Sequence, residues 1–321
     1  MKSSEIPRAQ APDRRTGLVI FGSFDCVAGL VYLIRALTLF FLVLTGAGPR
    51  PDVLSAGEIA VSALLALIPA AFFLTVGIGS MLGRRWARSL SFVFSTVWLV
   101  FDALTIGCLL TVLPGIVSAA GRKVPFPLYG SVIAFGILLP AAYVLFYGSG
   151  AVKAACEELD PQERWTDRCS AFVLASVIFL VVGAALELGL GFSGLRQRIF
   201  FGRVFGPDLR MALSAAAAVQ LAAAANLPRG KTWAWAAALA MTAARAVEDV
   251  VLARSVNLAR FESAVSSVRR LSERDAALLG SIGSLHLRPA VTGYVVLLGL
   301  ISVAVVARAG KGLRTIPGNR G

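Results

Sequence analysis

The sequence has little of the chemistry that most enzymes need. It has 321 residues but one histidine, His286. A single histidine excludes a bis-histidine haem site and any multi-histidine metal centre. A phosphate-binding glycine loop and a G-x-S-x-G nucleophile motif are also absent. The chain therefore shows no catalytic motif and predicts no cofactor and no metal ion, which favours a protein that is not an enzyme.

Cysteine is scarce as well. The four cysteines have neither a zinc-binding spacing nor the density of a disulfide framework. They are Cys26, Cys108, Cys156 and Cys169. We expect all four to be free thiols.

Charged residues are also few, and this low content excludes a soluble protein. Charged residues make up 15% of the chain and hydrophobic residues 57%, and the mean hydropathy is +0.77. A soluble domain has roughly 25% charged residues. Several apolar runs here are long enough to cross about 30 Å of hydrocarbon. The chain therefore belongs in a lipid bilayer.

Most of the charges that remain are positive, giving a formal net charge of +13. In a soluble protein this excess would indicate nucleic-acid binding. Here the basic residues lie mostly between the apolar runs, where anionic headgroups attract them. We therefore expect a bilayer with anionic headgroups as a partner, and no nucleic acid.

The apolar runs predict an all-α polytopic transmembrane helix bundle of about eight spans. The first run is too long for a signal-peptide core, so we count it as a span. The sixth run is short and rich in alanine, and its length does not decide whether it crosses the membrane. The predicted spans cover residues 17–44, 59–81, 90–113, 128–147, 171–192, 211–225, a stretch beginning at 233, and 291–306.

A polar segment divides these spans into two halves. We expect an N-terminal membrane half of four helices at residues 1–148, a cytosolic connecting loop at 149–169 and a C-terminal membrane half at 170–321. Similar basic turns, GRRWAR from Gly83 and GKTWAW from Gly230, precede one span in each half. This echo fits two four-helix halves.

Lysine and arginine predict the orientation of the first half. The loops on the N-terminal side carry most of its basic residues, whereas the opposite side has Arg50, Arg122 and Lys123. This asymmetry predicts a cytosolic N-terminus in the cell inner membrane. In the second half the basic residues do not determine which loops are cytosolic. We expect Trp165 and Trp233, each beside a basic turn, at the same cytosolic interface.

An amphipathic pattern follows the seventh span, at residues 254–275. Apolar Leu258, Phe261 and Val265 recur there at helical spacing, with arginines between them. This pattern predicts a helix outside the hydrocarbon. Such a helix lies in the headgroup layer, packs on a partner or packs on its own protein.

Two segments resemble a group of uncharacterised bacterial multi-pass membrane proteins. They are GSMLGRRWARSLSFVFSTVWL, Gly79–Leu99, and ILLPAAYVLFYGSGAVKAACEELDPQERWTDRC, Ile137–Cys169. In that group an RRWAR-type turn precedes one helix and a WTD-x-C segment precedes another. Ser170, Ala171 and Phe172 stand where the group has prolines, and the resemblance covers about the first half of the chain. The resemblance implies a bacterial multi-pass membrane protein, and it implies no particular activity, because the group has none assigned.

Several charged residues fall inside the predicted spans. At about 1.5 Å per residue, six of them lie at similar depths, so they would form one layer in the outer half of the bilayer. These are Arg35, Asp102, Glu187, Arg245, Glu248 and Asp249. Charges are costly in hydrocarbon and usually face a partner or a cavity. We therefore take the six as candidate functional or structural buried charges.

Their pairing has two interpretations. We expect Arg35 and Arg245 to point into the bundle and approach Asp102 and Glu187 on other helices. Alternatively, Arg245 pairs along its own helix with the carboxylates three and four residues later. Two arginines against four carboxylates leave an acidic excess, which fits protonated carboxyls or a bound cation. Asp25 stands apart from this layer, nearer the cytosol.

These observations leave two main hypotheses for function. The first is a non-catalytic scaffold or accessory subunit that docks partners through the 149–169 loop or the 254–275 helix. The second is a proton- or cation-coupled transporter that uses the buried charge layer.

Overall fold

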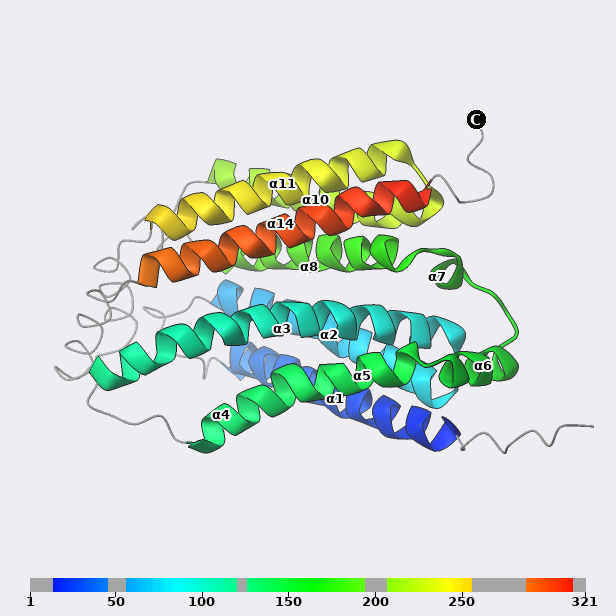
Figure 1. Ribbon diagram of the computed structural model, residues 1–321. Helices are drawn as coiled ribbons and strands as arrows, with labels where there is room; N and C mark the ends of the chain where they lie inside the picture. The colour runs from blue at the N-terminus through cyan, green and yellow to red at the C-terminus, as the bar shows by residue number, and fades with distance from the viewer. Residues whose placement is uncertain (1–13, 46–55, 120–125, 194–206, 256–286, 314–321) are drawn as a thin grey trace, which may run out of the picture.

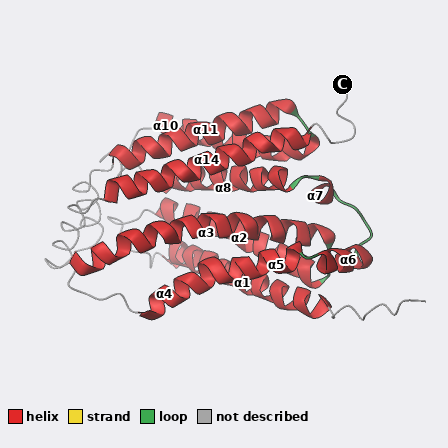
Figure 2. Cartoon of the chain, in the orientation of Figure 1, coloured by secondary structure: helices red, strands yellow, loops and turns green. Residues whose placement is uncertain are grey.

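The computed structural model describes residues 14–45, 56–119, 126–193, 207–255 and 287–313 (Figure 2). These residues are helical almost throughout, and they include no strand. The first helices are α1 (Arg14–Thr45), α2 (Ala56–Met81), α3 (Arg85–Ala119), α4 (Phe126–Ile133), the π-helical η1 (Ala134–Leu138) and α5 (Leu139–Gly148). Two short helices follow, α6 (Gly150–Leu159) and α7 (Trp165–Arg168). The last are α8 (Ala171–Ser193), α10 (Pro207–Asn226), the 3-10 turn η2 (Leu227–Arg229), α11 (Thr232–Ser255) and α14 (Leu287–Leu313).

The long helices run side by side in two groups (Figure 1). One group contains α1, α2, α3 and the rod made of α4, η1 and α5. The other contains α8, α10, α11 and α14. The groups meet where α3 packs against α8 and α14, and where α2 packs against α8. The expected all-α polytopic helix bundle is therefore confirmed.

Seven segments of the described chain are long and apolar enough to cross a membrane. They include Met211–Arg229, so the short sixth run has the length and composition of a span. Of the eight predicted spans, α11 is the one that is not among these seven segments. Its 24 residues include Arg245, Glu248 and Asp249. These charges lower its hydropathy, but α11 packs along α14 and runs beside it (Figure 1). The seventh predicted span is therefore a helix of the bundle that hydropathy alone does not identify.

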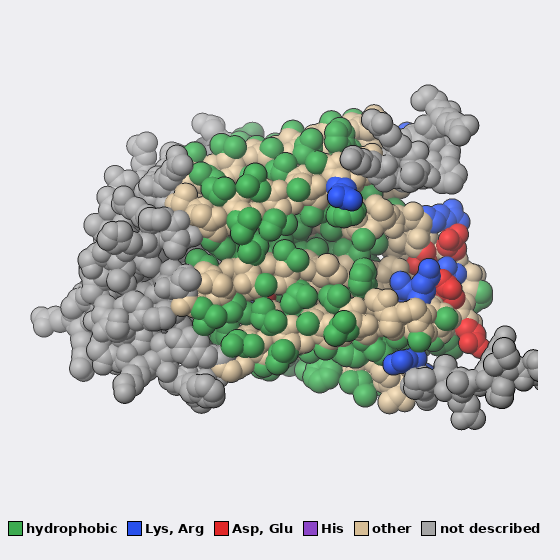
Figure 3. All heavy atoms as spheres, in the orientation of Figure 1, with side chains coloured by type: hydrophobic (Ala, Val, Ile, Leu, Met, Phe, Trp, Pro, Cys, Tyr) green, Lys and Arg blue, Asp and Glu red, His purple; other side chains and the backbone are tan. Residues whose placement is uncertain are grey.

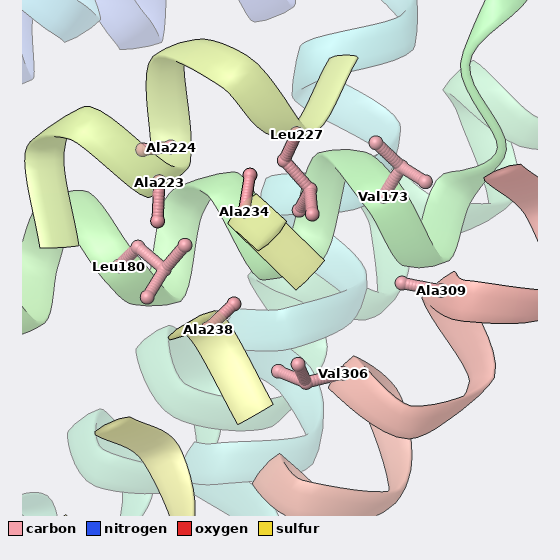
Figure 4. Close-up of a cluster of buried hydrophobic side chains, with 9 residues drawn as sticks. All are labelled: Val173, Leu180, Ala223, Ala224, Leu227, Ala234, Ala238, Val306 and Ala309. Atoms are coloured by element: carbon pink, nitrogen blue, oxygen red, sulfur yellow. The ribbon is translucent and has the colours of Figure 1, made fainter. Parts of the chain in front are cut away.

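Small side chains hold the C-terminal group together (Figure 4). Its buried cluster takes residues from α8, α10, η2, α11 and α14: Val173, Leu180, Ala223, Ala224, Leu227, Ala234, Ala238, Val306 and Ala309. Helices in lipid associate mainly by close van der Waals packing, which short side chains permit. The alanine-rich sequence of α10 and α11 is thus the basis of this packing.

The N-terminal group is built around larger side chains. Tyr143 and Tyr147 of α5 are buried there with Leu18, Val152 and Cys156. A third cluster, of Val93 on α3 with Leu174 and Ala175 on α8, joins the two groups. This cluster adds a buried apolar contact to the interface between the groups.

Charged side chains gather at the end of the bundle that carries α6 and α7 (Figure 3). Asp160, which is buried, lies 3.6 Å from Arg84, and Glu157 lies 3.6 Å from Arg85. These two ion pairs fasten α6 to the first turn of α3. The start of α1 and the end of α14 lie at this same end (Figure 1).

The two tryptophan-bearing turns share that end of the bundle. Trp165 is the first residue of α7 and Trp233 is the second of α11, and both turns lie beside the polar end in Figure 1. The two side chains are 51% and 49% exposed, as suits aromatic anchors at a membrane interface. The expectation that they share one end is confirmed. The predicted helix at 254–275 lies outside the described residues beyond its first two positions.

Both basic turns need glycine. Gly83 has a φ of 66° and Gly230 a φ of 73°, in the left-handed region that other residues rarely adopt. A Cβ on Gly83 would also meet the side chain of Leu159 on α6. The echo between the two turns thus reflects the same backbone requirement before α3 and before α11.

Replacing Gly83 tests this requirement. We expect Gly83→Ala to lower the free energy of unfolding by about 1–2 kcal/mol, because alanine is strained at positive φ. Unfolding in detergent, followed by circular dichroism, measures the change. Gly150→Ala is the control, since a Cβ there meets nothing within 4 Å and the residue is helical. Equal stability of Gly83→Ala and the wild type would contradict the strain argument.

Candidate ligand site between the two helix groups

A pocket of about 390 Å³ opens between the two helix groups, among α3, α8, α10, α11 and α14. Its walls are mostly apolar, and the polar side chains that line it include Gln220, Arg245 and Asp249. Ligand pockets are typically ~300–1,000 Å³ and combine apolar walls with a few polar groups. Four aromatic rings contribute to the wall: Phe94, Trp98, Phe101 and Phe179. The pocket thus has the size and lining of a site for a small amphipathic molecule.

Glu187 organises the polar side of this pocket. Its Oε1 accepts a hydrogen bond from Nε2 of Gln220 at 2.8 Å and lies 3.4 Å from Nη1 of Arg245. Glu187 is 6% exposed and Gln220 3%. The other carboxylate oxygen of Glu187, Oε2, is buried and has no hydrogen-bond partner in the described part of the chain. The carboxylate of Glu187 on α8 therefore contacts both α10 and α11 through Oε1, whereas Oε2 accepts no hydrogen bond from the described residues.

Arg245 contacts a second carboxylate on its own helix. Its Nε lies 3.9 Å from Oδ2 of Asp249, one turn later. Nη1 also donates to the carbonyl oxygen of Gly183 on α8, at 3.5 Å. One guanidinium thus faces two carboxylates, one on α8 and one on its own helix.

Glycine at position 183 lets this cluster close. A Cβ there would lie 2.7 Å from Oε1 of Gln220 and 3.9 Å from Nη1 of Arg245. A Cβ at this position would push the Gln220 amide away from α8, whereas Arg245 is at an ordinary contact distance. Gly183 therefore allows the side chain of Gln220 on α10 to reach Glu187.

The structure brings together three of the six charges that the sequence placed in one layer. Glu187, Arg245 and Asp249 form the cluster described above, so Arg245 makes both the interhelical contact and one of the contacts along its own helix. Glu248 instead lies on the exposed face of α11. Asp102 is half-buried and accepts a hydrogen bond from Nε1 of Trp98 at 2.6 Å.

The expectation that Arg35 points into the bundle is wrong. Its side chain is exposed on α1, and it forms no ion pair with any residue that the structure describes. The buried stripe of α1 contains Gly22, Gly29 and Ala36, and Arg35 is rotated from Ala36 by about 100°. Position along the helix therefore did not determine the direction in which the Arg35 side chain points.

The sequence did not predict two of the buried polar contacts, those of Gln220 and of Asp25. Gln220 is neutral, although a glutamine inside an alanine-rich span is itself an unusual polar signal. Asp25 is not isolated: it is 7% exposed, and its Oδ1 accepts a hydrogen bond from Tyr143 at 3.0 Å. Next to it, Tyr147 and Ser80 share a hydrogen bond. Asp25 thus belongs to a buried polar group that joins α1, α2 and α5.

A second cavity, of about 440 Å³, lies at the polar end of the bundle among α3, α6, α7 and the start of α8. Its lining includes both Cys156 and Cys169. These two thiols are free, as predicted. Burial raises the pKa of the Cys156 thiol to about 11, and it also raises the pKa of Cys169. Both thiols therefore stay protonated near neutral pH.

No protein-family model, no curated protein and no solved structure matches this chain. The apolar helices by themselves indicate an integral multi-pass membrane protein. Within the described residues, no three His, Cys, Asp or Glu side chains are grouped to hold a metal ion. The pocket and its charge cluster are thus the evidence from which a function is argued.

The ion pair between Arg245 and Glu187 gives a stability test. Arg245→Ala leaves a buried carboxylate without its cation, which we expect to lower the free energy of unfolding by about 3–5 kcal/mol. The double variant Arg245→Ala, Glu187→Gln should recover part of this loss, because the buried side chain at 187 then carries no uncompensated charge. Thermal unfolding in detergent measures both changes.

Arg35→Ala is the matched control for this test. It also removes an arginine at mid-helix, but one that is exposed and forms no ion pair with the described residues. We expect its stability to stay within about 0.5 kcal/mol of the wild type. Similar losses in Arg35→Ala and Arg245→Ala would contradict the assignment of the pair.

The pKa of Cys156 predicts slow alkylation. A rise from 9.0 to about 11 reduces the thiolate fraction at pH 8 about 100-fold, and the thiolate is the reactive form. N-ethylmaleimide should therefore modify Cys156 at least about tenfold more slowly in the folded protein than after unfolding in SDS. Peptide mass spectrometry follows the reaction. Equal rates in the two states would show that this thiol is neither buried nor perturbed.

Proposed function

We propose that the protein is a proton- or cation-coupled transporter that takes an amphipathic organic cation into the pocket between its helix groups. The observation that carries the proposal is the Glu187–Arg245–Asp249 cluster beside this pocket. Ionisable groups inside membrane spans are costly and commonly belong to substrate or proton pathways. Transporters also tend to bind their substrates between two helical repeats near the middle of the membrane.

The charge of the cluster favours a cationic substrate. Arg245 faces two carboxylates, and two carboxylates beside one guanidinium attract a cation more strongly than an anion. Aromatic rings in the wall, such as Phe94, Trp98 and Phe179, also attract cations through their faces. An anion would meet an arginine whose charge is already balanced.

Glu187 is the group that we assign to coupling. Its Oε2 is buried without a hydrogen-bond partner in the described chain, and this oxygen is where a proton or a small cation would bind. A proton or cation bound there would weaken the attraction between Glu187 and Arg245. Arg245 would then interact more strongly with Asp249, and Asp249 would attract the substrate less. Substrate and coupling ion would thereby act on one electrostatic cluster.

We further propose that the polar end of the bundle is cytosolic and that the membrane is a bacterial inner membrane. The end that carries α6 and α7 also holds the basic turn of Arg84, Arg85 and Arg88, in keeping with the excess of basic residues on cytosolic loops. The resemblance of Gly79–Leu99 and Ile137–Cys169 to bacterial multi-pass proteins supports the same membrane.

The alternative of a non-catalytic scaffold has less support. Its argument rested on the carboxylates of the 149–169 loop as a docking surface. Glu157 and Asp160 are engaged with Arg85 and Arg84, so these carboxylates hold α6 onto α3. The other docking element, the 254–275 helix, lies mostly outside the described residues and stays a prediction.

Binding of ethidium, an amphipathic aromatic cation, tests the proposal. Fluorescence anisotropy with the purified protein in detergent should show saturable binding. Asp249→Asn should weaken it about tenfold, because a charge-assisted contact is lost, whereas Arg35→Ala should bind as the wild type does. In proteoliposomes, an imposed pH gradient should drive ethidium accumulation, and Glu187→Gln should abolish the coupling.

Two results would contradict the transporter. One is ethidium binding that is absent or that does not respond to Asp249→Asn. The other is uptake that does not respond to the pH gradient or to a sodium or potassium gradient. Either result, together with stoichiometric co-purification of another protein, would favour the scaffold.

A further inference from the structure

The cavity at the polar end is unlike the pocket between the helix groups. Its lining is rich in charged and hydroxyl side chains from α3, α6, α7 and the segment before α7: Arg85, Arg88, Ser89, Lys153, Glu157, Glu163, Thr166 and Asp167. At about 440 Å³ it is large enough for a ligand group. It also lies at the end where charged side chains gather (Figure 3) and where Trp165 is half exposed. This is the level expected for lipid headgroups.

The carboxylates of this cavity already have partners. Glu157 lies 3.6 Å from Arg85 and 3.9 Å from Lys153. Glu163 lies 3.4 Å from Arg168. Asp167 accepts hydrogen bonds from the hydroxyl of Ser89 at 3.1 Å and from the backbone N–H of residue 164 at 3.0 Å. Each carboxylate of the lining therefore already forms an ion pair or accepts hydrogen bonds from the protein itself.

Two donors of the lining stay unused. Arg88 forms no ion pair with any residue in the described ranges, although it lines the cavity. Thr166 is 4% exposed, and its hydroxyl has no hydrogen-bond partner among the described residues. Three cations, Arg85, Arg88 and Lys153, and three carboxylates line the cavity. Glu163 also lies 3.4 Å from Arg168, which is outside the lining. A buried hydroxyl and an unpaired guanidinium in one cavity call for an acceptor with negative charge.

We propose that this cavity binds a phosphate group through Arg88 and Thr166. A phosphate supplies several oxygens, enough to accept from a guanidinium in a bidentate manner and from a hydroxyl at the same time. It would also give Arg88 a negatively charged partner, which the described carboxylates do not supply. Either the headgroup of an anionic phospholipid or a free phosphate ion offers this chemistry. The site is independent of the pocket proposed for transport.

Native mass spectrometry and thermal unfolding of the full chain in a maltoside detergent test the proposal with three probes. They are phosphatidylglycerol, diacylglycerol with the same acyl chains and no phosphate, and inorganic phosphate. We expect phosphatidylglycerol to bind and to raise the unfolding temperature, and diacylglycerol to do neither. Arg88→Gln should weaken phosphatidylglycerol binding about tenfold or more, and Thr166→Val should weaken it by a smaller factor.

Arg168→Gln is the matched control. It removes an arginine from the same end of the bundle whose side chain is 67% exposed and does not line the cavity. Its lipid binding should equal that of the wild type. Because Arg88 and Thr166 come from different helices, the two variants report on the site independently if one of them folds poorly.

The outcomes separate the sources of the phosphate. Binding of phosphatidylglycerol alone supports a headgroup site, and binding of inorganic phosphate, with or without the lipid, supports a site that recognises the ion itself, provided in each case that Arg88→Gln weakens it. Equal binding of diacylglycerol and phosphatidylglycerol would overturn the proposal, because the phosphate would then not be recognised. Equal losses in Arg88→Gln and Arg168→Gln would also overturn it, since general surface charge would explain them.

Discussion

Hydrocarbon as the solvent is the constraint on which the whole structure depends. In lipid, burial of apolar side chains does not drive helices together, because the surroundings are equally apolar. Association then relies on close packing and on a few interhelical polar contacts. This chain uses both: alanines such as Ala223 and Ala238 let α8, α10 and α11 approach, and Glu187 joins the same helices through Gln220 and Arg245. In the C-terminal group, packing and polar contacts therefore join the same helices.

The two helix groups meet this constraint in different ways. The C-terminal group packs small side chains closely, whereas the N-terminal group surrounds Tyr143 and Tyr147 and satisfies their hydroxyls with Asp25 and Ser80. Between the groups, Val93 of α3 packs with Leu174 and Ala175 of α8, and α3 also packs against α14.

Charge is divided by depth into two systems with different chemistry. At the polar end, ion pairs such as Arg84 with Asp160 hold α6 against α3, and the neighbouring cavity keeps donors that fit an anion. Between the helix groups, Arg245 is outnumbered by carboxylates, and the site fits a cation. The two sites therefore differ in the sign of the ligand that they favour, which allows each to be tested without the other.

The sequence by itself determined the class of the protein and its layout along the membrane normal. Hydropathy and length identify the spans because the thickness of the hydrocarbon fixes how many apolar residues a helix needs. The glycine turns at Gly83 and Gly230 were visible as a repeated pattern, and the depth of Glu187 and Arg245 followed from the rise of the helix. The charged helix α11 is the limit of this reasoning, because its hydropathy alone does not mark it as a span.

Only the tertiary structure decided which side chains face one another. Arg35 and Arg245 have similar depths, yet Arg35 is exposed and Arg245 reaches Glu187. The difference comes from the rotation of each helix about its axis, which depends on the packing of its neighbours. Gln220 and the contact of Asp25 with Tyr143 were missed for the same reason, since their partners are distant in sequence. Depth is a one-dimensional property that a sequence contains, whereas a site requires the directions of several helices at once.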